Sequence, residues 1–204
     1  MSEAADRDTP PPLAEAVGGA LGIAESVLPS AAFVATYTAT GQQTQPALIA
    51  AVAVGAFFAS ARLVRRQPAR FALAGLVGIA ISAYVVSRTG RAEDFFLPGL
   101  LANAGYALAY AISIAVRWPL LGVFIAIASN RGMEWRQDPA RVRAYSRASW
   151  VWVGLFSLRL AVQLPLYLTG AVVALGVTRV AMGVPLFAVG IWLSWLILRT
   201  RQHA

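Results

Sequence analysis

Apolar stretches as long as a membrane-spanning helix recur along almost the whole sequence, and they limit what the chain can fold into. A helix needs about 20 apolar residues to cross a hydrocarbon core of ~30 Å. The stretches are 13–40, 46–65, 68–88, 95–116, 149–168 and 175–198. They predict an all-α fold, an integral membrane helical bundle with about six transmembrane helices.

The composition excludes an ordinary soluble domain. Of the 204 residues, 58% are hydrophobic and 13% are charged, whereas soluble proteins have about 25% charged residues. We expect a single transmembrane helical domain over 13–199, a disordered polar tail over 1–12 and a short cytoplasmic tail over 200–204. The first tail is polar and acidic, unlike the start of a cleaved signal peptide, so the first hydrophobic helix is expected to stay.

The net charge of the chain is +8. All of its positively charged side chains are arginines, since the chain contains no lysine. In a soluble protein such a charge would suggest nucleic acid as a partner. Here the arginines lie at the ends of apolar stretches, where they indicate topology, because basic loops stay in the cytoplasm. We therefore expect both termini in the cytoplasm and no nucleic acid partner.

The stretch 119–129 is apolar over only eleven residues, which suits a re-entrant or interfacial segment better than a span. Reading it as a full span would move the basic stretch 131–147 to the opposite side of the membrane, and the sequence leaves the two readings open. Asp138 and Pro139 together form an N-cap and a first-turn proline. They predict an amphipathic cytoplasmic helix that continues into 149–168.

Two stretches carry local packing signals. Ala51, Gly55 and Ala59 recur every four residues, which indicates a face where another helix can approach closely. Pro29 interrupts the first stretch, which is longer than a span needs. We expect this helix to kink at Pro29 or to lie partly along the interface.

Three charged side chains fall inside apolar stretches, where a charge is costly and often functional. They are Glu25, Arg159 and Arg179. The alternative to a functional role is a structural one, in which Glu25 pairs with an arginine or lies at the membrane interface. Arg159 lies too deep for easy snorkelling and so needs an internal partner. The candidates are Glu25, the hydroxyls of Tyr106 and Tyr110, and carbonyls freed at Pro29 or Pro165.

Polar side chains form stripes on two of the expected helices, at steps of three and four residues. The first stripe consists of Asn103, Tyr106, Tyr110, Ser113 and Arg117. The second consists of Ser149, Trp152, Arg159 and Gln163. If the stripes face each other, they line a polar cavity or channel. Ordinary hydrogen bonding between helices explains them equally well.

The connector between 68–88 and 95–116 gathers charges at the outer end of both helices. Its charged residues are Arg88, Arg91, Glu93 and Asp94. One interpretation is an outer mouth or gate for a substrate. The other is helix capping by Asp94 with Glu93 near the helix dipole, together with surface ion pairs.

The sequence offers little to catalysis by metals or cofactors. It has no cysteine, and its one histidine, His203, lies in the tail. We therefore expect no metal site and no cofactor. The motifs of nucleotide hydrolysis, of magnesium-dependent prenyl transfer and of serine or zinc proteolysis are also absent.

The segments GRAEDFFLPGLLANAGYALAY and LRLAVQLPLYLTGAV resemble an uncharacterised bacterial family of small membrane proteins, classed as a domain of unknown function. The resemblance covers most of the chain after Leu13. It implies a bacterial inner-membrane location and a loose association with intracellular septation proteins. It implies no activity and assigns no role to any residue.

Three classes of function follow from these features. The chain could bind or pass a small anion or another solute, with Arg159 and Arg179 favouring an anion and Glu25 coupling a proton. It could instead be an intramembrane enzyme on a lipid or prenyl substrate, with Glu25 or Asp94 as general acid. A structural partner of envelope machinery is the third class. The expected partners are the lipid bilayer and a small anion, proton or lipid substrate, and a homo-oligomer stays open.

Overall fold

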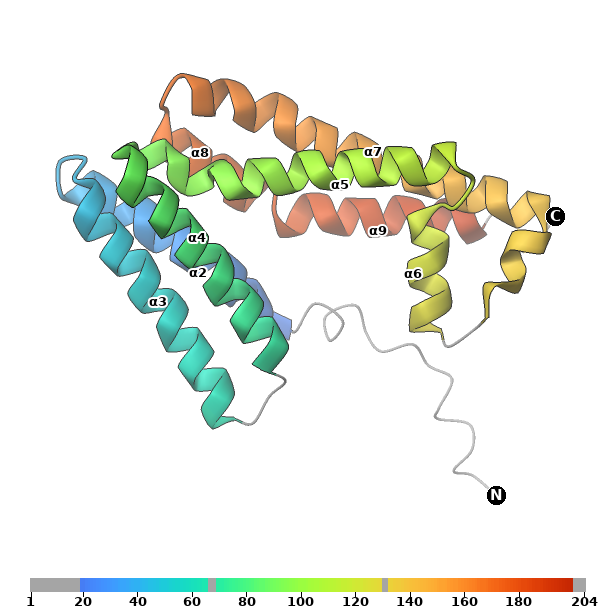
Figure 1. Cartoon of the computed structure of the whole chain (residues 1–204), viewed down its shortest axis with the longest axis horizontal. Helices are drawn as coiled ribbons and strands as arrows, with labels where there is room; N and C mark the ends of the chain where they lie inside the picture. The colour runs from blue at the N-terminus through green and yellow to red at the C-terminus, as the bar shows by residue number, and fades with distance from the viewer. Residues whose placement is uncertain (1–18, 66–68, 130–131, 200–204) are drawn as a thin grey trace. The chain divides into compact units, whose positions relative to one another are not determined.

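The computed structural model describes the backbone of residues 19–65, 69–129 and 132–199 (Figure 1). It describes side chains over 27–61, 63–65, 75–129 and 132–199. Within these ranges every regular element is a helix, which confirms the all-α fold class. The expected tails over 1–12 and 200–204 lie outside the described residues. By its internal contacts the chain divides into two units, 1–83 and 84–204, which are described separately below.

The first unit contains α2 (Gly19–Ala39), α3 (Thr44–Val64) and most of α4 (Ala69–Thr89). Helix α2 runs through Pro29 as one helix, with that proline buried. The predicted small-residue face on α3 is confirmed, because Ala51, Gly55 and Ala59 are all buried. Helix α3 packs along α2. A Cβ added to Gly55 would collide with Cδ1 of Ile79, so this glycine leaves room for the Ile79 side chain of α4.

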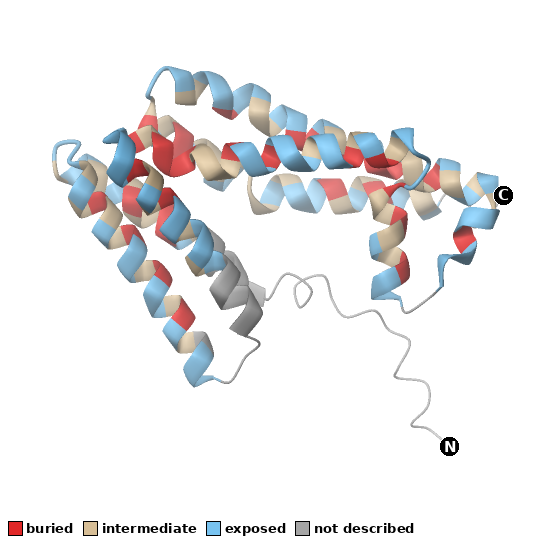
Figure 2. Cartoon of the chain, viewed as in Figure 1, coloured by how far each residue is buried: buried red, intermediate tan, exposed pale blue. Residues whose placement is uncertain are grey.

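The second unit begins with the last turn of α4 and continues through seven further helical elements. They are η1 (Ala92–Phe96), α5 (Leu97–Ala115), α6 (Leu120–Ala128), η2 (Met133–Gln137), α7 (Pro139–Leu168), α8 (Val172–Ala181) and α9 (Val184–Arg199). Helix α7 is the centre of this unit, since α5 and α9 both pack along it (Figure 1). Figure 2 shows buried positions recurring along α5 and α7, where the two helices meet.

Four helical segments in the described part of the chain are long and apolar enough to cross a membrane. They are 44–61, 92–115, 139–168 and 172–199. Helices α2 and α4 are each 21 residues long and carry shorter described apolar stretches, Val27–Ala39 and Gly75–Thr89. Four membrane-capable segments are therefore shown, and the expected total of about six spans stays a prediction. The last segment combines α8 and α9, which are separated by a break at Met182 and Gly183.

Helix α6 is the short apolar segment whose role the sequence left open. Its 9 residues give a length of about 14 Å at ~1.5 Å per residue, less than half of a hydrocarbon core. A Cβ added to Gly122 would lie 3.0 Å from atoms of both Trp135 and Tyr145, so α6 packs closely on η2 and α7. The length favours a re-entrant or interfacial segment over a span.

The predicted start of α7 is confirmed in detail. Oδ1 of Asp138 accepts hydrogen bonds from the backbone amides of Ala140 at 2.8 Å and Arg141 at 3.4 Å. Pro139 occupies the first helical position, where its missing N–H costs nothing. The helix then continues for 30 residues to Leu168, as expected for a surface helix that runs into a span.

Candidate functional site

Aromatic contacts fix the alignment of α5 against α7. The ring centroids of Tyr110 and Trp152 lie 6.1 Å apart, and those of Tyr106 and Phe156 lie 5.3 Å apart. Towards the other end, the hydroxyl of Tyr167 donates a hydrogen bond of 2.5 Å to Oδ1 of Asp94. Residue numbers fall along one helix as they rise along the other. The helices are therefore antiparallel, and residues on the same level can be paired by counting from these contacts.

The two polar stripes do face each other, as the sequence suggested. On α5, Asn103, Tyr110 and Ser113 are buried, whereas Tyr106 is 55% exposed and Arg117 is exposed. On α7 the residues Ser149, Trp152 and Gln163 are buried and Arg159 is half-buried.

Around Tyr110, however, the stripes meet through aromatic packing. Trp152, Phe156 and Phe187 of α9 join this cluster, with the rings of Trp152 and Phe187 4.8 Å apart. The indole N–H of Trp152 donates to Oγ of Ser194 at 3.0 Å, and Ser194 donates to the carbonyl of Gly190 at 2.7 Å. This half of the interface is thus a packed aromatic core in which Trp152 and Ser194 are hydrogen-bonded, whereas Oγ of Ser149 is buried without a partner among the described residues.

Ser113 has a structural role that the stripe did not reveal. Its hydroxyl donates to the carbonyl of Tyr110 at 2.7 Å and accepts from the backbone amide of Leu120 at 3.2 Å. Leu120 is the first residue of α6, so Ser113 ties the end of α5 to the start of the short helix. Hydrogen bonding between helices explains this member of the stripe.

Arg159 lies on the α7 face beyond the aromatic core. Its Nε donates a hydrogen bond of 2.8 Å to the backbone carbonyl of Met182. That carbonyl lies at the break between α8 and α9, where no further helical turn can use it. The expectation of an internal partner is confirmed, but the partner is a carbonyl freed at this break and not one freed at Pro165.

Arg179 enters the same region from the last turn of α8. Its guanidinium lies against Gly99 at the start of α5, where an added Cβ would be 2.7 Å from Nη1. Its Cζ lies 5.8 Å from the centroid of the Phe96 ring. An aromatic face attracts a cation, but this contact does not neutralise the charge.

We call Arg159 and Arg179 the arginine pair, and among the described residues no carboxylate forms an ion pair with either of them. The side chain of Arg159 reaches the end of α8 that carries Arg179, because a Cβ added to Gly183 would lie 3.9 Å from Nη2 of Arg159 and 3.2 Å from the backbone carbonyl oxygen of Arg179. In the described part of the chain the ion pairs are Arg91 with Glu93 and Arg141 with Asp138, and neither involves the arginine pair. Two like charges in an apolar surrounding repel each other and are costly to bury.

Asn103 on α5 and Gln163 on α7 carry carboxamide side chains within about two helical turns of the level of Arg159. Asn103 comes three residues before Tyr106, and Arg159 comes three residues after Phe156, so both lie one helical turn from the same ring contact. Gln163 lies one further turn along α7. Both amides are buried, with 9% of Asn103 and 5% of Gln163 exposed.

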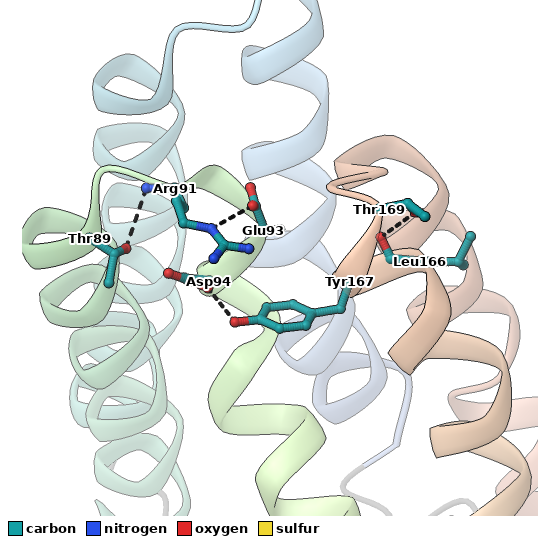
Figure 3. A network of polar contacts seen from close by, with 7 residues as sticks. All are labelled: Thr89, Arg91, Glu93, Asp94, Leu166, Tyr167 and Thr169. Carbon is teal, nitrogen blue, oxygen red and sulfur yellow. Dashed lines mark hydrogen bonds and ion pairs between the residues drawn. The ribbon is translucent and has the colours of Figure 1, made fainter.

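The charged connector is arranged as a network at the end of the unit where α5 begins and α7 ends (Figure 3). Nε of Arg91 donates to Oε1 of Glu93 at 2.7 Å, and this hydrogen bond raises the pKa of the Arg91 guanidinium. Its Cζ lies 5.9 Å from the centroid of the Tyr167 ring. Arg88 is exposed, with its Cζ 5.3 Å from the Tyr84 ring.

Asp94 does not cap a helix, so that part of the sequence interpretation is wrong. Helix α5 begins at Leu97, its N-cap is Phe96, and no side chain caps it. Asp94 is instead turned into the unit, 3% exposed, and accepts the hydrogen bond from Tyr167. The Asp94 carboxylate thus accepts its hydrogen bond from a residue 73 positions away and not from the backbone amides at the start of α5. The surface ion pair between Arg91 and Glu93 is confirmed.

Glu25 lies on α2 in the first unit, and its side chain lies outside the described residues. Sequence reasoning missed Gly99, Tyr167 and Met182, which hold the charged residues in place. Nothing in the sequence marks Met182, since a backbone carbonyl has no residue signature. Gly99 carried a weak signal, because a glycine in the first turn of a helix often permits a close approach.

The described residues contain no group of three or more histidine, cysteine or acidic side chains that could hold a metal ion.

Comparison with known proteins gives one match. A family model described as "Protein of unknown function (DUF3159)" matches residues 17–204. No curated protein and no solved structure matches the chain. The family description names neither an activity nor septation, so the association with septation stays a prediction.

Proposed function

The chain belongs to the DUF3159 family, whose description assigns no function, and from its own residues we propose that it binds a small anion between α5, α7 and α8 and passes it across a membrane. The proposal also places the protein in a bacterial inner membrane with both termini in the cytoplasm. It gives the arginine pair the central role.

One observation carries this proposal: the side chain of Arg159 reaches the break after α8, the helix that carries Arg179, and among the described residues neither arginine has a carboxylate partner. Structural arginines inside membranes usually pair with an acid or with backbone carbonyls. Arg159 uses one of its five N–H groups on the Met182 carbonyl. The guanidinium of Arg179 makes no hydrogen bond within the described part of the chain. A bound anion would relieve the repulsion and fill these donors.

The connector network supports an entrance at the far end of the same helices. Glu93 accepts a hydrogen bond from Arg91, and Asp94 accepts one from Tyr167, so both carboxylates of the connector are held by a donor. Negative groups at a mouth hinder an anion unless they are neutralised or turned away. We assign Arg88, Arg91, Glu93 and Asp94 to the outer mouth, with the contact between Asp94 and Tyr167 as the part that closes it.

The arrangement of exposed arginines supports the proposed orientation. Arg117, Arg136, Arg141, Arg143 and Arg147 are all exposed around the end of the second unit opposite the connector. Basic residues concentrate on the cytoplasmic side of a membrane protein. The connector then faces outward.

Anion flux into liposomes tests the function. The purified protein is reconstituted into vesicles, and uptake of nitrate and of chloride is followed under an imposed gradient. We expect protein-dependent flux of at least one anion and strong reduction in Arg179→Gln. Arg143→Gln is the matched control, because it removes an exposed arginine of the same helix bundle and leaves the site intact. Flux equal to that of empty vesicles for both anions, or equal flux in wild type and Arg179→Gln, would refute the proposal.

A further inference from the structure

The donors around the arginine pair are suited to a particular shape of anion. A guanidinium presents parallel N–H groups in a planar fork, which matches two oxygens carried by one atom. The fork of Arg179 is free of hydrogen bonds within the described residues, and both Nη groups lie against Gly99 at the start of α5. A halide ion can neutralise the positive charge, but a single atom cannot accept the two parallel N–H groups as well as two oxygens can.

Asn103 and Gln163 add two donors of a different kind. Both side chains are buried, and neither makes a hydrogen bond to any part of the chain that the structure describes. Their amide groups are not among the fully buried atoms that lack a partner, so they keep some accessible surface and can donate to a ligand. Carboxamide N–H groups donate readily to oxyanions.

The helix alignment gives the levels of Asn103, Arg159 and Gln163 along α5 and α7, and the contact with Gly99 gives the level of Arg179. Asn103 lies on the level of Arg159, counted from the contact between Tyr106 and Phe156. Gly99 lies one turn before Asn103 on α5, and Gln163 lies one turn after Arg159 on α7. Since Arg179 packs on Gly99, its fork and the amide of Gln163 are on the same level.

We infer that the ligand of this site is an oxyanion presenting two oxygens from one centre, such as a carboxylate, nitrate or phosphate, and that Asn103 and Gln163 bind it together with Arg159 and Arg179. The inference rests on the proposed function and names its substrate class. The arginines supply charge and a bidentate contact. The amides then distinguish an oxyanion from a halide, because they can reach oxygens that a single sphere does not offer.

Gly99 is a positioning residue in this scheme. An added Cβ would lie 2.7 Å from Nη1, 3.3 Å from Cζ and 3.4 Å from Nη2 of Arg179, so an alanine must displace the fork. Gly105, six residues further along α5, has open space around its added Cβ and provides the control. We expect Gly99→Ala to weaken oxyanion binding, whereas Gly105→Ala leaves it unchanged.

Ligand binding to the purified full chain tests the inference. Thermal unfolding is measured in detergent while chloride is replaced by formate, nitrate or phosphate, mole for mole at constant sodium. We expect at least one oxyanion to stabilise the wild type more than chloride does, and the three oxyanions identify which charge the site prefers. Gln163→Met, which keeps the size of the side chain, should weaken oxyanion binding about tenfold, as expected for one hydrogen bond to a charged group. Its chloride response should change little.

Asn103→Asp gives a result that poor folding cannot imitate. A carboxylate at this position supplies the missing negative charge from within the chain. We expect the variant to be more stable than the wild type without an oxyanion and to lose the oxyanion response.

Two other outcomes show whether the proposed ligand class alone is wrong or whether anion binding itself is wrong. If chloride stabilises the wild type as strongly as every oxyanion, or if Gln163→Met weakens both kinds of anion equally, the oxyanion class is wrong and anion binding stands. If no anion stabilises the wild type more than it stabilises Arg179→Gln, both are wrong.

Discussion

Nε of Arg159 donates a hydrogen bond of 2.8 Å to the carbonyl of Met182, so that one side chain of α7 holds the break between α8 and α9. The arginine therefore has two tasks. One N–H stabilises the chain itself, and the remaining ones face the region that Arg179 also enters.

Removal of this arginine is expected to destabilise the break. Arg159→Leu leaves the half-buried Met182 carbonyl without its donor, and loss of a hydrogen bond to a charged group costs about 1.5–3 kcal/mol. Part of this loss is offset, because Arg179 no longer faces a like charge. Unfolding in mixed micelles measures the difference. Arg143→Leu serves as the control, since Arg143 is exposed on the same helix. Equal stability of the two variants would show that the Met182 contact contributes nothing.

The contact between Asp94 and Tyr167 makes a second prediction. Tyr167→Phe leaves the buried carboxyl group of Asp94 without its only hydrogen bond among the described residues, and we expect a loss of about 1–3 kcal/mol. Tyr84→Phe is the matched control, because Tyr84 is exposed and its hydroxyl has no described partner. The measurement is thermal stability in one detergent and lipid. A loss of the same size in both variants would contradict the role given to Asp94.

Glycine 190 makes a third prediction about how α9 packs on α7. An added Cβ at Gly190 would lie 2.8 Å from Cδ1 of Leu155, so Gly190→Ala should cost about 1–3 kcal/mol through overpacking. Gly154→Ala should be neutral or stabilising by up to about 1 kcal/mol, since its added Cβ meets nothing within 4 Å and alanine favours the helix. If both variants gain stability, α7 and α9 do not pack as closely as the structure has them.

The N-cap of α7 makes a milder prediction. Asp138→Ala removes the acceptor for the amides of Ala140 and Arg141, which should cost about 1 kcal/mol. The long helix behind it remains held by its contacts with α5 and α9. Thermal unfolding and the yield of folded protein both test this. Complete loss of folded protein would mean that the cap is required for insertion or assembly of the helix.

Topology can be tested with single cysteines, because the native chain contains none. Gln42, Gln137 and Thr169 are all exposed, which makes them suitable positions. An impermeant thiol reagent added to intact cells should label cysteines at positions 42 and 169 and should leave position 137 unlabelled. Labelling at position 137 from outside would reverse the proposed orientation of α7.

The sequence predicted local features better than distant ones. The start of α7 was predictable, because Asp138 and Pro139 act on amides within three residues of themselves. The close-packing face of α3 was predictable from the spacing of its small residues. Most members of the two stripes lie on the faces where α5 and α7 meet, as helical periodicity indicates, whereas Tyr106 and Arg117 are exposed.

Features that depend on the path of the chain were not predictable. Asp94 resembles a cap in sequence, but its partner comes from Tyr167, 73 residues away. The partner of Arg159 is a backbone carbonyl, which becomes free only because α8 ends at Ala181. The meeting of Arg159 with Arg179 likewise depends on how α8 returns from the end of α7. No spacing within a single helix contains this information.

Among the described residues no acid is paired with Arg159 or Arg179, and this has an electrical consequence for the proposed anion site. A carboxylate of the protein would neutralise the arginines from within the chain. In the proposed site, a bound anion from solution neutralises them instead. The charge of this anion must cross part of the transmembrane voltage, which is worth about 2.3 kcal/mol per elementary charge for every 100 mV across the full membrane. With the cell interior negative, the voltage alone drives a monovalent anion outward through this site. Uptake against that field would require a cation or proton to travel with it.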